Sequence, residues 1–235
     1  MHPTIRLFTE AALAAGQPVA LSAGQAHYLS SVMRRAPGES VALFNGRDGE
    51  WQARLDRLDR RAAVAVPQHQ LRGQQPEPDL WLVFAALKRD ATELVVEKAT
   101  ELGVSRLVPV TTAHTVATRL NPQRLAAIAT EAAEQCERLS VPEIALLAPL
   151  WAVLDAWPPG RRLVLLAERS QAAAVAPAPG PGGLLVGPEG GFNAAELDAL
   201  MRCPPIVPAS LGRRVLRAET AAIAGLSRLL AQPDA

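Results

Sequence analysis

Three glycines stand close together toward the carboxyl-terminal end of the chain, in the segment from Leu184 to Asn193, LLVGPEGGFN. A strand-like apolar run leads into the glycines, and Asn193 with Glu196 then caps a helix. Glycines at such a junction let the backbone turn sharply and let a ligand approach the main chain closely. A tight turn followed by a helix cap accounts for one glycine but not for three. Because open α/β sheets bind ligands at the carboxyl ends of their strands, this segment predicts a ligand-binding loop.

The glycine segment matches neither of the two common nucleotide-binding patterns. It lacks the Gly-Lys-Ser/Thr ending of a phosphate-binding loop, and it is not a G-x-G-x-x-G dinucleotide fingerprint. The residues by themselves therefore predict a ligand loop without naming its ligand.

A second candidate segment, Leu211 to Ala221 (LGRRVLRAETA), places three arginines and one acid at the start of a predicted helix. Arginines beside a helix amino terminus form a site for an anion or another polar ligand. Three solvated arginines, with Glu219 favoured by the helix dipole, explain the same pattern. Both interpretations stay open on this segment alone.

Composition is that of an ordinary globular protein, with 49% hydrophobic residues and a net charge of +1 over 235 residues. Cys136 and Cys203 are far apart, and four scattered histidines form no metal-ligand pattern. We expect two reduced thiols and no metal. No run reaches the about 18 to 20 apolar residues that span a bilayer, and the first ten residues lack a signal-peptide core. We therefore expect a cytoplasmic protein that has no membrane partner.

A polar stretch at residues 72–79, RGQQPEPD, is the best candidate for a linker, and it predicts domains at 1–72 and 73–235. Short strand-like pieces at 39–45, 50–56 and 62–68, with one helix at 27–35, suggest a small β-barrel in the first domain. Residues 1–75 carry a net charge of +3 and the remainder carries −2. A basic first domain suits contact with phosphates, although three charges can equally be a solvated face.

The second domain alternates predicted strands and helices. Strands are expected at 80–87, 104–110, 162–167, 184–186 and 205–208, and helices from Asp90 to 102, from Pro122 to 139, after Asn193, and from 218 to 230. Asp90 and Glu93 have the spacing of a capping box. This alternation predicts a largely parallel α/β sheet.

The two candidate segments together are far more specific than either one. GPEGG, followed about twenty residues later by LGRRVLRAET, resembles the RsmE family, the 16S ribosomal RNA (uracil-N3-)methyltransferases of the SPOUT class. The resemblance covers essentially the whole chain, including 27–39, 98–104 and 134–138. It implies a PUA-like barrel as RNA-binding domain 1–72, followed by a SPOUT α/β domain with a carboxyl-terminal trefoil knot. Relatives often have an Arg-Ser pair where this chain has His114-Thr115.

The resemblance also implies the cofactor S-adenosylmethionine, bound in the knot against the backbone of three loops. Carried onto this sequence, the cofactor-binding residues are Leu166, Ala167, Glu168, Gly187, Pro188, Glu189, Gly190, Ser210, Leu211, Gly212 and Leu216. Close main-chain approach to a flat adenine agrees with the glycines, and Leu211 and Leu216 would pack on it.

Methylation of uracil at N3 needs loss of the N3 proton, which leaves negative charge on the ring carbonyl oxygens. A fixed guanidinium beside those oxygens would stabilise the charge, and Arg138 and Arg217 are the candidates. Glu219 is a candidate either to orient an arginine or to accept the proton.

The resemblance implies 16S rRNA or the small ribosomal subunit as substrate, and a homodimer as the working form. Ala126, Ala129, Ala133 and Cys136 share one helix face, which favours either a helix–helix contact between subunits or core packing within one subunit. Two alternative functions remain: a knotted methyltransferase acting on another RNA nucleotide, on ribose 2′-O or tRNA for example, and a non-catalytic RNA-binding protein. The binding protein has no need to keep both GPEGG and LRAET, whereas an enzyme needs both.

Overall fold

The structure is a computed structural model, and it describes residues 5–167, 172–177 and 180–231. Contacts divide the chain into two compact units. The N-terminal unit comprises the residues up to 76 together with 133–141, and the second unit comprises 77–132 and the residues from 142 onward. Residues 133–141, which the sequence placed in the second domain, therefore pack with the first.

The N-terminal unit is built on a sheet that contains five strands among the described residues, in the order β1-β3-β4-β5-β2. The strands are β1 (Arg6–Phe8), β2 (Val19–Leu21), β3 (Ser40–Phe44), β4 (Glu50–Leu58) and β5 (Ala63–Arg72). β1 pairs in parallel with β3, and the other pairs are antiparallel. Three register shifts between β4 and β5 bend this long pair around a core of small and branched apolar side chains.

A short helix accompanies this sheet. α1 (Ala23–His27) begins at a capping box between Ser22 and Gln25 and continues into a π-helical turn, Tyr28–Val32. The helix expected at 27–35 therefore starts earlier, because Ser22 and Gln25 satisfy the free amides of its first turn.

A buried carboxylate ties the segment 133–141 to the rest of the N-terminal unit. Glu50 is fully buried between Arg6 and Arg72 and accepts hydrogen bonds from both. The Arg6 guanidinium also donates to the backbone carbonyls of Ala133, Glu134 and Arg138. One arginine thus donates hydrogen bonds to a carboxylate on β4 and to three carbonyls of a segment that is distant in sequence.

The second unit contains a parallel sheet with seven strands among the described residues. Its order is β12-β10-β11-β6-β7-β8, and β9 also pairs with β7. The strands are β6 (Leu80–Ala85), β7 (Arg106–Thr111), β8 (Glu143–Ile144), β9 (Ala148–Pro149), β10 (Arg162–Leu166), β11 (Gly182–Val186) and β12 (Ile206–Ala209). All pairs are parallel, which confirms the predicted sheet type. The knot expected of the SPOUT class stays a prediction, because strand order does not define it.

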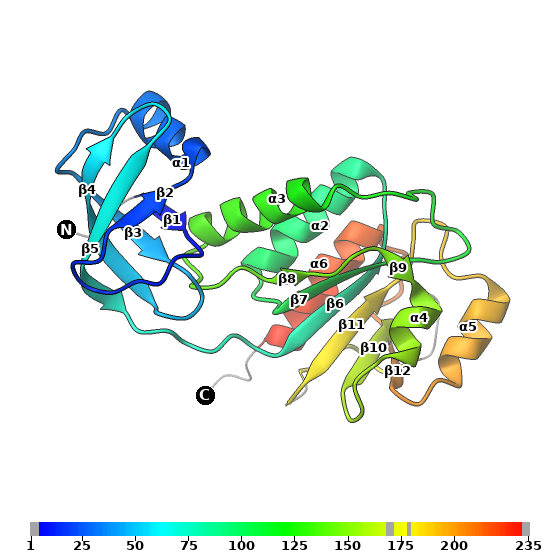
Figure 1. Ribbon diagram of the computed structural model, residues 1–235. Helices are drawn as coiled ribbons and strands as arrows, with labels where there is room; N and C mark the ends of the chain where they lie inside the picture. Colours follow the sequence, from blue (N-terminus) through cyan, green and yellow to red (C-terminus); the bar gives the residue numbers. More distant parts are fainter. Residues whose placement is uncertain (1–4, 168–171, 178–179, 232–235) are drawn as a thin grey trace. The chain divides into compact units, whose positions relative to one another are not determined.

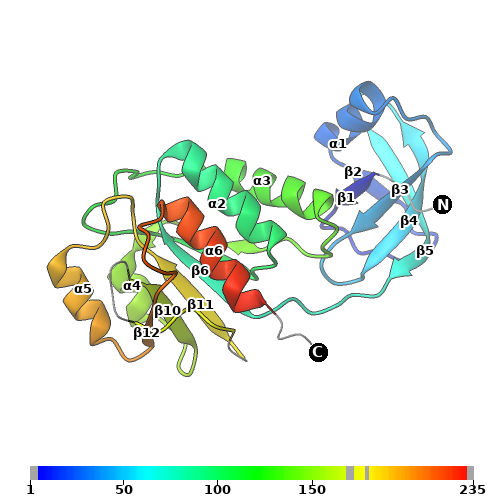
Figure 2. The same cartoon turned by 180° about the vertical axis from the view of Figure 1, so that it is seen from behind.

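Helices cover both faces of this sheet (Figures 1 and 2). α2 (Arg89–Glu101) and α6 (Ala218–Leu230) lie on one face, and α4 (Leu150–Asp155) and α5 (Ala194–Met201) lie on the other. Successive strand residues serve opposite faces: Leu185 joins the core under α4 and α5, whereas Leu184 lies within van der Waals reach of Gly225 on α6. Strands buried on both faces explain the unbroken apolar runs in the sequence.

Two helix starts confirm the expected caps and one differs. The Asn121 side chain accepts from the Arg124 amide at the start of α3 (Pro122–Gln135), and Asn193 with Glu196 forms a complete capping box on α5. The capping box expected from Asp90 is wrong, because α2 begins at Arg89 with Lys88 in the cap position. Thr92 makes the side-chain contact at this helix start instead. Its hydroxyl accepts a hydrogen bond from the amide of Leu87 and donates one to the carbonyl of Leu87.

Among the described residues, no helix is long and apolar enough to cross a membrane.

Candidate ligand-binding site

Three neighbouring strand ends carry the loops that the sequence singled out. β10 ends at Leu166, β11 at Val186 and β12 at Ala209, and the three strands are adjacent and parallel. Leu166 and Ala209 are register partners, and the amide of Ala167 donates to the carbonyl of Ala209 at 3.1 Å. The segments that follow these strands therefore emerge at one edge of the sheet, where open α/β sheets bind ligands.

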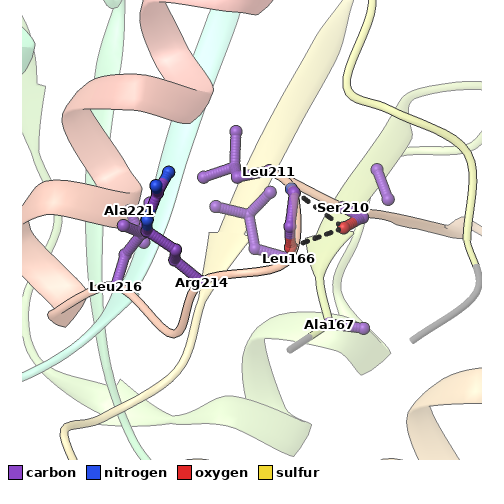
Figure 3. Close-up of a pocket in the computed structure, with 9 residues that line it drawn as sticks. Leu166, Ala167, Ser210, Leu211, Arg214, Leu216 and Ala221 are labelled. Atoms are coloured by element: carbon purple, nitrogen blue, oxygen red, sulfur yellow. Dashed lines mark hydrogen bonds between the residues drawn. The ribbon is translucent and has the colours of Figure 1, made fainter. Parts of the chain in front are cut away.

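A shallow, open pocket lies at this edge (Figure 3). It is lined by Leu166, Ala167, Ala209, Ser210, Leu211, Gly212, Arg214, Leu216 and Ala221. Six of these are expected cofactor-binding residues, namely Leu166, Ala167, Ser210, Leu211, Gly212 and Leu216. The lining is mostly apolar, with one guanidinium and one hydroxyl. Such a pocket suits a flat, largely apolar ring system whose polar edges meet backbone groups.

The loop after β12 is shaped by Ser210 and Gly212. The amide of Gly212 donates to the Ser210 hydroxyl at 3.1 Å, and Gly212 has φ +114°. Side chains with a Cβ rarely adopt this backbone region, so the turn depends on glycine. The carbonyl of Ser210 accepts from the amide of Val175. These bonds fix the backbone conformation of the loop that lines the pocket.

Two glycines of the GPEGG segment are packed against aromatic side chains of the protein itself. A Cβ on Gly187 would lie 2.9 Å from the Phe192 ring, and a Cβ on Gly190 would lie 3.3 Å from Cβ of His114. Gly191 has φ +68°, which explains the third glycine. In the described structure these contacts account for the segment without a ligand.

None of the expected residues Gly187, Pro188, Glu189 and Gly190 lines the pocket that the described residues form. The Glu189 carboxylate instead accepts from the Lys88 amide at 3.4 Å. Glu168, the remaining expected residue of the first loop, lies outside the described residues.

His114 anchors the glycine segment from the neighbouring loop. Its ring Nδ1 lies 3.2 Å from the carbonyl oxygen of Gly190 and 3.0 Å from that of Gly191. The adjacent amide of Ala113 donates to Glu196 at 2.8 Å. Where the resemblance led us to expect arginine, this chain thus places an imidazole that holds two loops together.

The expected catalytic residues fall in different parts of the structure. Arg217 occupies the cap position of α6 and is exposed, and Glu219 lies half-buried in the first turn of that helix. Arg138 belongs to the N-terminal unit, where it is buried and donates to the Ser140 hydroxyl at 3.1 Å. A catalytic role for each of the three stays a prediction.

Sequence reasoning missed Arg214, Ala209 and Ala221 as lining residues. Arg214 was indistinguishable from its neighbours Arg213 and Arg217, because a loop has no periodicity to show which side chain faces inward. Ala221 had a signal, since it is a small residue in the first turn of the helix that follows the loop.

The small residues on one face of α3 differ in burial. Ala129 and Ala133 are fully buried within the chain, whereas Ala126 is exposed. Ala133 packs with Phe44 and Leu139 in a small core. Core packing therefore accounts for the buried pair.

Comparison with known proteins places the chain in a family. A family model described as RNA methyltransferase domain matches residues 74–230, and one described as RNA methyltransferase PUA domain matches 21–68. Ribosomal RNA small subunit methyltransferase E from Rickettsia conorii is 29% identical over 95% of this chain and 94% of the relative. The Synechocystis protein of the same name is 30% identical and covers 90% of this chain and 72% of its own length.

Solved structures agree with the sequence relatives. A crystal structure of ribosomal RNA small subunit methyltransferase E from Neisseria gonorrhoeae, bound to S-adenosylmethionine, has a TM-score of 0.86 at 26% identity and covers 95% of each chain. A Legionella pneumophila structure in complex with the same cofactor also has a TM-score of 0.86, at 28% identity over 96% of each chain. The chain belongs to the ribosomal RNA small subunit methyltransferase E family, as the sequence motifs indicated.

Proposed function

We propose that this protein transfers the methyl group of S-adenosylmethionine to N3 of a uridine in the 16S rRNA of the small ribosomal subunit. The observation that carries the proposal is the pocket at the ends of β10 and β12. It lies inside the matched methyltransferase domain and is lined by six of the residues expected to bind the cofactor.

The residues present fit the cofactor. Leu166, Leu211 and Leu216 give the pocket apolar walls for an adenine ring, and Gly212 leaves the turn after β12 without a side chain. Ala221, a small side chain in the first turn of α6, leaves room on the helix side of the pocket. When bound, the cofactor supplies an electrophilic methyl group on its sulfonium. Alignment of the two reactants contributes up to about 7 to 11 kcal/mol in favourable cases.

Arg217 and Glu219 carry the proton chemistry in this proposal. Arg217 is exposed at the cap of α6, directly after the pocket-lining Leu216, so its guanidinium is available to a target base. It stabilises the negative charge that develops on the uracil carbonyl oxygens as the N3 proton leaves. Glu219 either orients this arginine or accepts the proton, and a pH–rate profile of Glu219→Gln distinguishes the two roles. Arg138 is the second candidate for the guanidinium.

The N-terminal unit captures the RNA. Its PUA match and the net charge of +3 over residues 1–75 support phosphate contacts that position the substrate without reading sequence. The target uridine must be unpaired or flipped out of its stack before N3 can meet the methyl group. The enzyme works in the cytoplasm, where ribosomal subunits are assembled, and as a homodimer.

A methyl-transfer assay tests the proposal. Purified protein is incubated with S-adenosylmethionine carrying a labelled methyl group and, separately, with unmodified 16S rRNA, small subunits and tRNA. Label incorporated into a uracil base of 16S rRNA is the expected result. Label in ribose or in tRNA favours another knotted methyltransferase. Cofactor-independent RNA binding without label in any substrate favours a non-catalytic binding protein.

A further inference from the structure

A second pocket lies at the same edge of the parallel sheet, beyond β6 and β7. Its volume is about 340 Å³, and it lies entirely within the second unit. Its lining comes from the first turns of α2 and α3 and from the loop that joins β7 to α3. Arg89, Arg119 and Arg124 supply three guanidiniums. Leu120 supplies a partly exposed apolar side chain, whereas Leu87 and Leu125 are almost fully buried.

This pocket carries an excess of positive charge. Glu93 is its single lining carboxylate, and it accepts hydrogen bonds from Arg89 at 2.9 Å and from Arg124 at 3.1 Å. The bonds from Arg124 and Arg89 lower the pKa of the Glu93 carboxyl, so the carboxylate stays ionised and holds both arginines in place. Arg119 has no ion-pair or hydrogen-bond partner in the part of the chain that the structure describes. The starts of two helices add partial positive charge.

The two pockets are close neighbours along the sheet edge. The cofactor pocket begins at the end of β10, and the second pocket begins at the end of β6, with β11 between them. Two strand spacings amount to about 10 Å. The GPEGG segment fills the interval, and His114 and Ala113 tie it and α5 to the loop that carries Arg119. A chain of nucleotides crossing this edge would meet both pockets.

We propose that the second pocket binds a nucleotide of the RNA substrate next to the target uridine. Arg119 and Arg124 contact its backbone phosphate, and Leu120 contacts its base or ribose. The combination of guanidiniums with apolar walls suits a nucleotide better than a small free anion, which would need no apolar surface. A second S-adenosylmethionine is disfavoured because its sulfonium would face like charges. This inference rests on the proposed function, since it assumes an RNA substrate.

The test measures RNA binding and cofactor binding separately in the full chain. Unmodified 16S rRNA transcript is bound by filter retention at several salt concentrations, and S-adenosylmethionine is bound by calorimetry without RNA. The variants are Arg119→Gln and Arg124→Gln. Arg228→Gln is the matched control, because it removes an exposed arginine of the same unit that lies in the last turn of α6 and outside both pockets. Arg119 has no described partner to lose, so its substitution should leave the fold intact.

We expect each pocket variant to weaken RNA binding about tenfold, as for loss of a charge-assisted hydrogen bond. The slope of log affinity against log salt should fall by about 0.7 to 0.9 for each phosphate contact removed. Cofactor affinity and the Arg228→Gln control should stay at the wild-type values. The inference would be overturned if Arg119→Gln and Arg124→Gln had the same RNA affinity and the same salt slope as the control Arg228→Gln. Failure of the proposed function gives a different result: the wild-type protein itself binds no cofactor and transfers no methyl group.

Discussion

Gly212 has a backbone conformation that no other lining residue of the cofactor pocket requires, with φ +114° and open space around the position of a Cβ. Gly212→Ala therefore acts through backbone strain and not through a clash. Such strain costs about 1 to 3 kcal/mol, and the turn relieves it by moving away from the pocket. We expect calorimetry to show at least tenfold weaker binding of S-adenosylmethionine.

The control for this variant is Gly16→Ala in the N-terminal unit. Gly16 also has a positive φ, +78°, and also has open space around a Cβ, so the same strain is introduced away from the cofactor pocket. Normal cofactor binding by Gly212→Ala, or equal losses in both variants, would show that the turn after β12 does not hold the cofactor.

The arginines of the same loop separate into two roles. Arg214 lines the pocket, whereas Arg217 is exposed at the cap of α6. Arg217→Ala should lower the rate of methyl transfer by about 10²- to 10³-fold, as for loss of one oxyanion donor, and leave cofactor affinity unchanged. Arg214→Ala should weaken cofactor binding first. Arg213→Ala, the exposed neighbour, should change the rate within about 0.5 kcal/mol of activation free energy.

Single-turnover kinetics at saturating RNA and cofactor distinguish these effects. Equal losses in all three variants would indicate a shared role in phosphate binding. A wild-type rate in Arg217→Ala would remove Arg217 from the chemistry and leave Arg138 as the candidate.

The sequence predicts which loops line the cofactor pocket better than it predicts the contacts that individual residues make. Ser210 to Gly212 and Leu216 line the pocket as expected, because a loop that follows a buried parallel strand has one place to emerge. The glycines Gly187 and Gly190 pack on Phe192 and His114, and such contacts depend on tertiary proximity that spacing does not encode.

The sheet of the N-terminal unit has a buried ion pair, formed by Glu50 on β4 with Arg6 and Arg72, as its electrostatic anchor. Burial raises the pKa of Glu50, but the hydrogen bonds from Arg72 and Arg6 outweigh it and hold the pKa below its ordinary value of 4.5. A carboxyl with a lowered pKa in the folded state stabilises the fold above pH 4.5, and this contribution is lost as the pH falls through the folded-state pKa. We expect amides in β3, β4 and β5 to lose protection from hydrogen exchange as the pH falls below about 4.5.

Glu50→Gln isolates this contribution. Removing one partner of a buried pair typically costs about 3 to 5 kcal/mol, so protection at pH 7 should fall strongly and its dependence on acid pH should weaken. Asp56→Asn, which breaks an exposed pair with Arg54, should cost less than about 1 kcal/mol. Equal effects of the two variants, or a wild-type acid dependence in Glu50→Gln, would contradict the anchor role.

Long, strongly apolar elements were predictable and short ones were not. The strands β6 and β10 appear where their apolar runs predicted them, because burial on both faces leaves a clear pattern. The helix α6 spans the residues predicted for it. The strands β1, β2, β8 and β9 have two or three residues each, which is too short for any periodicity. Their pairing is set by neighbours that are distant in sequence.

For the whole molecule, the assignment of residues 133–141 to the N-terminal unit illustrates the same limit. The apolar pattern continues through this stretch from α3, and nothing local marks a change of unit. Arg6 ties residues 133–141 to the N-terminal unit, because its guanidinium donates to three backbone carbonyls of this stretch. These contacts join residues more than 120 positions apart in the chain. The sheet type and the two-unit organisation, by contrast, follow from the linker and from the alternation of elements.

The proposed homodimer makes a prediction for the whole molecule. Light scattering at micromolar concentration should give twice the chain mass of 24.9 kDa. Dilution until the mass halves should reduce methyl transfer in parallel if each site is completed by the partner. A monomeric mass with full activity would contradict the dimer without affecting the proposed chemistry.

The most direct test of the central claim is mass spectrometry of nucleosides from 16S rRNA. The rRNA is taken from a strain in which the gene has been deleted, before and after treatment with the purified protein and S-adenosylmethionine. We predict that 3-methyluridine is missing from the deletion strain and is restored by the wild-type protein but not by Gly212→Ala at limiting cofactor. A full level of 3-methyluridine in the deletion strain, together with no methyl group added by the purified protein, would contradict the claim that this chain methylates ribosomal uridine.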